Sequence, residues 1–194
     1  MTRNPATTAR RALAVILLVA VAGCASSRGQ RYQDRSMDFG SIRTVAVLPF
    51  TNLSRDNLAG DRMRDVFSSM LLATGAVYVV PYGEVARGVG RTGVAAPTQP
   101  STDEVVKLGT ALKVDGVVTG VVKEYGEVRS GTATSNVVSV SVALFETATG
   151  KVVWAGATTK GGIGMTDRLF GGGGAPLNDV SEAAVDDLLN KLFK

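Results

Sequence analysis

The segment Thr44-Val-Ala-Val-Leu-Pro-Phe50 decides the fold class of this 194-residue chain. It is apolar on both faces, as a buried strand is, and Pro49 marks its end. A helix is predicted over residues 58–74, with one apolar stripe at helical spacing: Met63, Val66, Phe67, Met70 and Leu71. Gly75 suits the end of that helix, and residues 76–80 predict a second buried strand before Pro81. This β-α-β unit implies two parallel strands joined by a right-handed crossover.

The rest of the chain predicts further helices and an antiparallel meander. A short helix over 84–89 and a loop over 90–100 precede a second long helix, which Ser101 and Glu104 open with a capping-box pattern. Strands are predicted over 117–125, 137–145 and 151–159, then a loop over 161–178 and a final helix over 179–193. The expected fold is therefore a single α/β domain with a mixed five-stranded sheet and helices packed on it.

The composition excludes several kinds of catalytic and metal site. The chain has no His, so it cannot build a Ser-His-Asp triad, a Cys-His dyad or a His-ligated metal site. Its single Cys rules out an internal disulfide and a Cys-rich zinc site. We therefore predict no catalytic residues, no metal site and no cofactor.

The N-terminus has the pattern of a targeting segment. Basic residues at 3, 10 and 11 precede an unbroken apolar run over residues 12–22, which is shorter than the roughly 20 residues of a spanning helix. The run ends in Val21-Ala22-Gly23-Cys24, which resembles a bacterial lipobox. We predict cleavage between Gly23 and Cys24 and lipidation of Cys24. The alternative is an ordinary secretory signal with a chance Cys.

These patterns divide the chain into a signal peptide over 1–23, a lipidated Cys with a flexible tether over 24–41, and a periplasmic domain over 42–194. The tether has an alternative, a short surface element packed on the domain through Tyr32, Met37 and Phe39. Removing three arginines with the signal peptide leaves 18 basic and 17 acidic residues, which gives no electrostatic case for nucleic-acid binding. Ala25, by resemblance to enterobacterial sorting signals, favours the outer membrane.

Other motifs are better explained by structure than by chemistry. Gly88-Val-Gly-Arg-Thr-Gly93 matches a dinucleotide-binding pattern, but the strand and helix that such a site needs are not predicted around it, so we expect a loop. The four glycines at 171–174 lack the end of a P-loop and also predict a loop. Trp154 is expected in the core or on a sheet face. Solvated surface charge explains the carboxylate pairs: Asp61 with Asp65, Glu124 with Glu127, and Asp186 with Asp187.

Several segments together resemble the periplasmic core of CsgG/HfaB-type and LpoB-type outer-membrane lipoproteins. The strongest are Asp115-Gly-Val-Val-Thr-Gly120 and Thr149-Gly-Lys-Val-Val-Trp154. The resemblance implies an α/β fold and a role without catalysis. Secretion channels of this family insert two β-hairpins per subunit, with strands of about 9–11 residues in the membrane. Residues 126–136 and 161–178 are too short or too rich in Gly for that, so we expect a domain without a pore.

The favoured function is a non-enzymatic structural or accessory lipoprotein of an envelope assembly or secretion complex. It would be anchored in the outer membrane by its lipid, face the periplasm, and bind another envelope protein or copies of itself. No nucleic acid and no small-molecule substrate is predicted. One alternative is an LpoB-like activator of a peptidoglycan synthase. The other is an envelope hydrolase that uses paired carboxylates.

Overall fold

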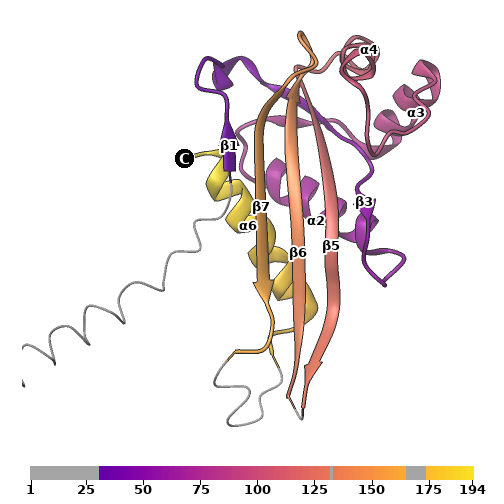
Figure 1. The fold of residues 1–194 in the computed structure, drawn as a ribbon. Coiled ribbons are helices and arrows are strands. Elements are labelled where there is room, and N and C mark those ends of the chain that lie inside the picture. The colour runs from indigo at the N-terminus through magenta and orange to yellow at the C-terminus, as the bar shows by residue number, and fades with distance from the viewer. Residues whose placement is uncertain (1–30, 132, 165–173) are drawn as a thin grey trace, which may run out of the picture.

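The computed structural model describes residues 31–131, 133–164 and 174–194. It forms a single α/β domain around a seven-stranded mixed sheet of order β1-β7-β6-β5-β2-β4, with β3 pairing to β5 beyond β2 (Figure 1). The strands are β1 (Arg31–Gln33), β2 (Thr44–Val47), β3 (Thr51–Asn52), β4 (Tyr78–Val79), β5 (Gly116–Ser130), β6 (Ala133–Glu146) and β7 (Val152–Gly161). The helices are η2 (Phe39–Ser41, a 3-10 turn), α2 (Ala59–Ala73), α3 (Tyr82–Thr92), α4 (Thr102–Leu112) and α6 (Leu177–Leu192).

The topology agrees with the predicted β-α-β unit and meander. Strand β2 runs parallel to β4 and β5, whereas β5, β6 and β7 pair in an antiparallel manner. The α/β class is therefore confirmed, although the sheet has two more strands than expected. One of these is β3, which exists because Pro49 ends β2 and the chain then rejoins β5 further along, at Val121.

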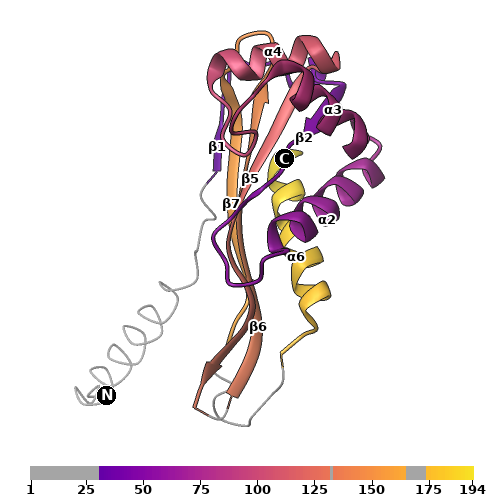
Figure 2. The ribbon, with the colours of Figure 1, turned by 90° about the vertical axis from the view of Figure 1, so that its right-hand side faces the viewer.

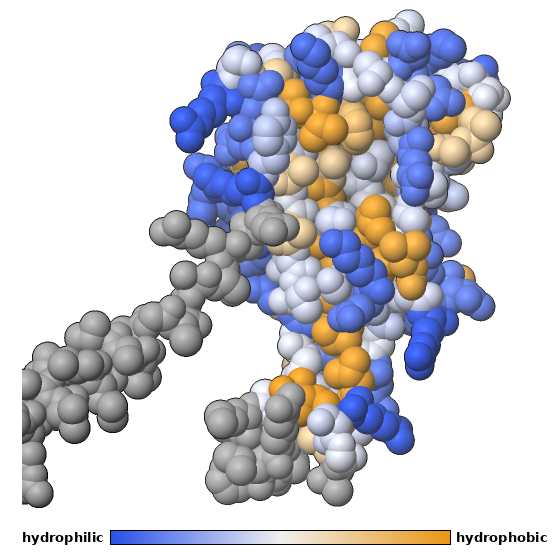
Figure 3. Space-filling view, viewed as in Figure 1, coloured by the Kyte–Doolittle hydropathy of each residue, from blue (hydrophilic) through white to orange (hydrophobic). Residues whose placement is uncertain are grey.

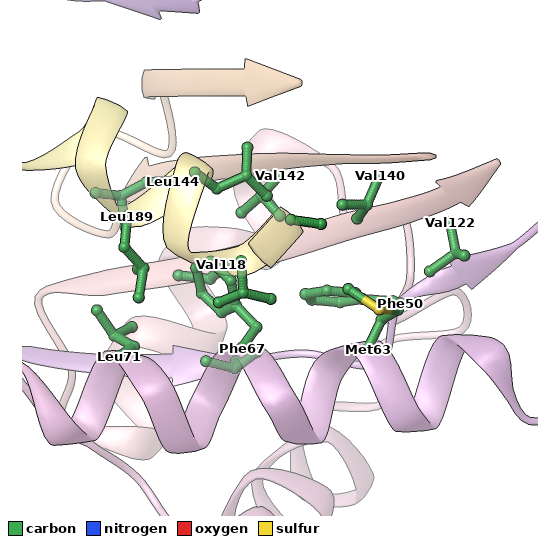
Figure 4. Close-up of a cluster of buried hydrophobic side chains, with 14 of the residues drawn as sticks. Phe50, Met63, Phe67, Leu71, Val118, Val122, Val140, Val142, Leu144 and Leu189 are labelled. Carbon is green, nitrogen blue, oxygen red and sulfur yellow. The ribbon is translucent and has the colours of Figure 1, made fainter. Parts of the chain in front are cut away.

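Helices α2 and α6 pack on one face of the sheet and form the main core (Figures 1 and 2). The predicted stripe of α2 is confirmed, since Met63, Phe67 and Leu71 are all buried there (Figure 4). Helices α3 and α4 pack on the opposite face, but only over β2 and the adjoining ends of β5 and β6. The capping box is also confirmed: the Ser101 N–H donates to Glu104 Oε2 at 2.7 Å and the Glu104 N–H donates to Ser101 Oγ at 3.4 Å.

The predicted tether over residues 24–41 is wrong in its second half. Residues 31–33 form β1, which pairs with β7 from Gly156 to Trp154. Met37 and Phe39 pack against the main core, as the alternative prediction had it. Six residues, 25–30, therefore separate Cys24 from the first strand.

Two predicted loops are also wrong. Residues 126–136, expected as a connection, belong to a long hairpin in which β5 and β6 stay paired to Ser130 and Ala133. Helix α3 extends to Thr92, so most of the motif Gly88–Gly93 is helical. Gly93 then ends the helix with φ of 67°. A motif placed inside a helix cannot form the tight turn that a dinucleotide site requires.

Candidate functional site

One face of the sheet has no described helix over β1, β7 and the parts of β5 and β6 beyond α3 and α4 (Figure 1). Successive side chains of a strand point to opposite faces, so the apolar residues of β6 point toward α2 and α6 and the small residues between them point away. We call this surface the bare face. All its residues are part-exposed or exposed: Tyr32, Thr119, Val121, Ser139, Ser141, Ala143, Ala155, Ala157 and Thr159.

The strand register arranges the bare face in rows of small side chains. One row runs from Tyr32 through Ala155 and Ala143 to Thr119, and the next from Ala157 through Ser141 to Val121. Together these rows line a shallow hollow of about 560 Å³. In the space-filling view, pale and orange residues run along the middle of this face (Figure 3).

A shallow surface made mostly of Ala, Ser and Thr lets another protein backbone approach closely. Its hydroxyls are partly paired already, since Thr159 Oγ1 donates to Ser139 Oγ at 2.9 Å. The charged side chains at the rim of the hollow, Arg31 and Lys123, are both basic. The bare face thus has the features of a docking surface, with shape and rim charge to select a partner.

A second hollow, which we call the apolar cavity, lies on the other face of the sheet, where α2 and α6 end. Its volume is about 600 Å³. Its lining comes from the segment from η2 to β2, from the end of α2 to β4, from β5 and β6, and from the end of α6: Phe39, Gly40, Ile42, Arg43, Val45, Leu71, Gly75, Ala76, Val77, Tyr78, Val118, Leu144, Leu192 and Phe193. Arg43 is the one charged residue among these described lining residues.

At least one member of each carboxylate pair that could suggest acid–base chemistry is held by a cation or an amide. Asp61 lies 3.6 Å from Arg64, and Glu127 lies 2.8 Å from Arg129. Asn190 donates to Asp186 at 2.8 Å. Among the described residues, no group of three His, Cys, Asp or Glu side chains could hold a metal ion.

Asp187 has the clearest electrostatic role. Lys160 lies 3.1 Å from its carboxylate and Lys191 lies 2.5 Å from it. Burial alone raises the pKa of Asp187, but hydrogen bonds from Lys191, Thr158 and Lys160 outweigh it and hold the pKa at about 2. A carboxylate this acidic stays ionised at neutral pH and joins α6 to β7 rather than moving protons.

The two motifs that carry the family resemblance are structural in this chain. One Asp115 carboxylate oxygen accepts from the backbone N–H groups of Arg43 and Thr44, both at 3.0 Å. In the second motif Thr149 Oγ1 donates to Glu146 Oε2 at 2.6 Å, and just before this motif Thr147 Oγ1 donates to the Val114 carbonyl oxygen at 2.6 Å. Trp154 is fully buried, as predicted. These residues fix the start of β2 against β5 and the β6–β7 turn.

Gly23, Cys24 and residues 171–173 lie outside the described residues, so the cleavage and lipidation sites stay predictions. Within the described ranges, no helix is long and apolar enough to cross a membrane.

The sequence contained a signal for the bare face, namely the Ser and Ala residues that alternate with Val in β6. The sequence contained no such signal for the apolar cavity, because the residues that line it are far apart in the chain, between residues 39 and 193.

No protein-family model matches the sequence, and a search of curated proteins gave no match. Solved structures do match in fold. The PelC dodecamer from Paraburkholderia phytofirmans is 17% identical, with a TM-score of 0.55 over 82% of this chain and 94% of that one. Lipoprotein GNA1162 from Neisseria meningitidis is 20% identical, with a TM-score of 0.55 over 77% of this chain and 97% of that one.

The LpoB C-terminal domain from Salmonella enterica is a weaker match. It is 12% identical, with a TM-score of 0.48 over 65% of this chain and 86% of that one. The likenesses to PelC and GNA1162 show a shared fold, which agrees with the α/β fold that the sequence motifs implied. At these identities they transfer no residue roles.

Proposed function

We propose that the chain is a non-enzymatic accessory lipoprotein of the cell envelope, anchored through Cys24 in the outer membrane and facing the periplasm. It acts by presenting the bare face to a protein partner, and the first partner is a second copy of the chain. The bare face is the observation that carries this proposal.

A sheet face normally packs against helices or a second sheet, and here a four-strand area stays uncovered by the described helices. Small side chains on it allow a neighbour to pack without displacing large groups. PelC, whose fold is similar, forms a dodecamer. A self-associating subunit therefore fits both the surface and the fold.

The envelope location is supported by the lipobox-like Val21-Ala22-Gly23-Cys24 and by a similar fold in a Neisseria lipoprotein. The non-enzymatic role is supported by the chain's lack of His and by the pairing of Asp61, Glu127, Asp186 and Asp187 with cations or amides. A hydrolase would need two carboxylates held apart around a substrate, with one pKa raised. Asp187 has a lowered pKa instead.

Ala143→Arg tests the docking role because Ala143 lies in the middle of the bare face. The purified full chain in mild detergent would be examined by sedimentation velocity over a range of concentrations. We expect the wild type to form a defined oligomer and Ala143→Arg to remain monomeric. Ala183→Arg is the matched control, since Ala183 is an exposed residue on the outer side of α6.

Circular dichroism melting would show whether the variants are folded. Oligomers that persist in Ala143→Arg, or an equal loss in Ala183→Arg, would contradict docking through the bare face. A wild type that stays monomeric at every concentration would contradict the second copy as the partner.

A further inference from the structure

We propose that the apolar cavity is a binding site for a single acyl chain with an anionic headgroup. The class of ligand follows from three observations: the chemistry of the floor, the charge at the rim, and the position of the cavity relative to the N-terminal segment.

The floor of the cavity accepts hydrocarbon and little else. The five most buried of its lining side chains are aliphatic, come from five different elements or connections, and are each at most 5% exposed: Ile42, Val45, Leu71, Val118 and Leu144. A sugar or a peptide would leave its polar groups unpaired against such a floor. The volume of about 600 Å³ lies inside the range of roughly 300–1,000 Å³ found for ligand sites.

The rim is amphipathic. Tyr78 is 56% exposed and Phe193 is 49% exposed, so their rings lie between solvent and the apolar floor. Such aromatic residues are typical at the boundary between hydrocarbon and water.

Arg43 supplies the charge at the rim. Its backbone N–H is held by the Asp115 carboxylate at 3.0 Å, which fixes where the side chain starts. Within the described part of the chain, no ion pair involves the Arg43 side chain. The described residues that line the cavity include no acidic side chain. A guanidinium in this position favours a carboxylate or phosphate headgroup.

The cavity lies near the point where the N-terminal segment joins the fold. Arg31 Nη1 donates to the Lys191 carbonyl oxygen at 3.3 Å, and the next two residues, Leu192 and Phe193, line the cavity. Cys24 precedes Arg31 by seven residues, a distance of at most about 25 Å when extended. If Cys24 is lipidated, as the proposed function requires, the cavity is within reach of the bilayer. The acyl chain can then come from a membrane phospholipid as well as from a free fatty acid.

Displacement of a fluorescent polyene fatty acid tests the site. The protein would be the chain from residue 25 onward, which keeps every described residue. Saturated fatty acids of increasing length would compete below their critical micelle concentrations. We expect affinity to rise by up to about fourfold for each added CH₂, the factor that corresponds to burying that group, until the cavity is full.

Two substitutions locate the binding. Val77 is a half-buried residue of the cavity wall, so the larger ring of Val77→Trp should fill the cavity and weaken binding at least about tenfold. Val128→Trp, on the exposed part of the β5–β6 hairpin, is the control. Arg43→Gln should weaken binding of fatty acids but leave binding of the matching fatty alcohols unchanged. Circular dichroism melting would confirm that each variant is folded.

Binding to vesicles distinguishes the two possible sources of the acyl chain, a membrane phospholipid and a free fatty acid. If the protein sediments with phosphatidylglycerol vesicles and Val77→Trp abolishes this, the acyl chain comes from a phospholipid. If the protein binds free fatty acids but not vesicles, the ligand is a free fatty acid. No displacement of the probe, no dependence on chain length, or equal affinity in Val77→Trp would overturn the proposal. Fatty-acid binding that persists in Ala143→Arg would show that the cavity and the bare face are independent.

Discussion

Replacing Phe67 with Ala should remove the centre of the main core. Phe67 is 1% exposed on the inner side of α2, and its ring lies 6.1 Å from the ring of Phe50 at an angle of 55° (Figure 4). The ring also has neighbours from the sheet, among them Val118. These neighbours come from several elements, so α2 and the sheet cannot simply collapse into the space that the ring leaves.

The magnitude follows from burial and from the aromatic pair. Phe→Ala in a core costs about 3–5 kcal/mol, and an aromatic pair such as Phe50 with Phe67 accounts for about 0.5–1.5 kcal/mol. We expect the free energy of unfolding to fall by about 4 kcal/mol, a large part of a typical total of about 5–15 kcal/mol. With an m value of about 2 kcal/mol per molar urea, the unfolding midpoint should move by about 2 M.

Leu72→Ala is the matched control, because Leu72 lies on the same helix but is 52% exposed. Its free energy of unfolding should change by no more than about 0.5 kcal/mol. Urea titrations followed by circular dichroism would measure both variants. If Phe67→Ala unfolds at the same urea concentration as Leu72→Ala, the inward face of α2 has been assigned wrongly.

Three further outcomes are expected. Cys24→Ser should abolish palmitate labelling, and labelling that continues would exclude this thiol as the attachment point. The folded-state pKa of Asp187, about 2, lies below its ordinary value of 3.8, so the stability it contributes should be present above about pH 4 and lost as pH falls toward 2; Asp187→Asn should lack it at neutral pH, as urea midpoints against pH would show. Gly150→Ala should lower stability by at least about 1–2 kcal/mol, because φ is 69° and a Cβ would overlap the Thr102 carbonyl oxygen; an unchanged thermal midpoint would contradict that contact.

The parts of the fold that the sequence predicted have strong local signals. The α2 stripe repeats over several turns, and the Ser101–Glu104 box is completed by side chains three residues apart. Trp154 follows two strand-forming residues, Val152 and Val153, and is fully buried. Each signal lies within a few residues, so no knowledge of distant contacts is needed to interpret it.

The parts that the sequence missed depend on distant contacts. Strand β1 is three residues long, and it exists because β7, more than 100 residues later, offers it a free edge. The end of the β5–β6 hairpin, residues 126–136, which we call the outer hairpin, has a mostly polar sequence, so its strands lack the alternation that usually identifies them. There the backbone pairing of Glu127 with Asn136 and Arg129 with Thr134 holds an exposed β5 end against β6, in which Ala133 and Ser135 are buried.

The bare face and the outer hairpin have a common origin in the lengths of the elements. Strand β5 has 15 residues and spans about 50 Å, whereas α2, also of 15 residues, spans about 22 Å. One helix is too short to cover the full length of a strand. Helices α2 and α6 together cover much of one face of the sheet, and the shorter α3 and α4 cover only part of the other. The uncovered remainder carries Ala, Ser and Thr rather than Leu or Ile, so its exposure to water costs a single copy little. A partner that covers the bare face buries little apolar area, so the free energy of association from apolar burial is small. We therefore expect association through the bare face to depend on protein concentration and on shape complementarity.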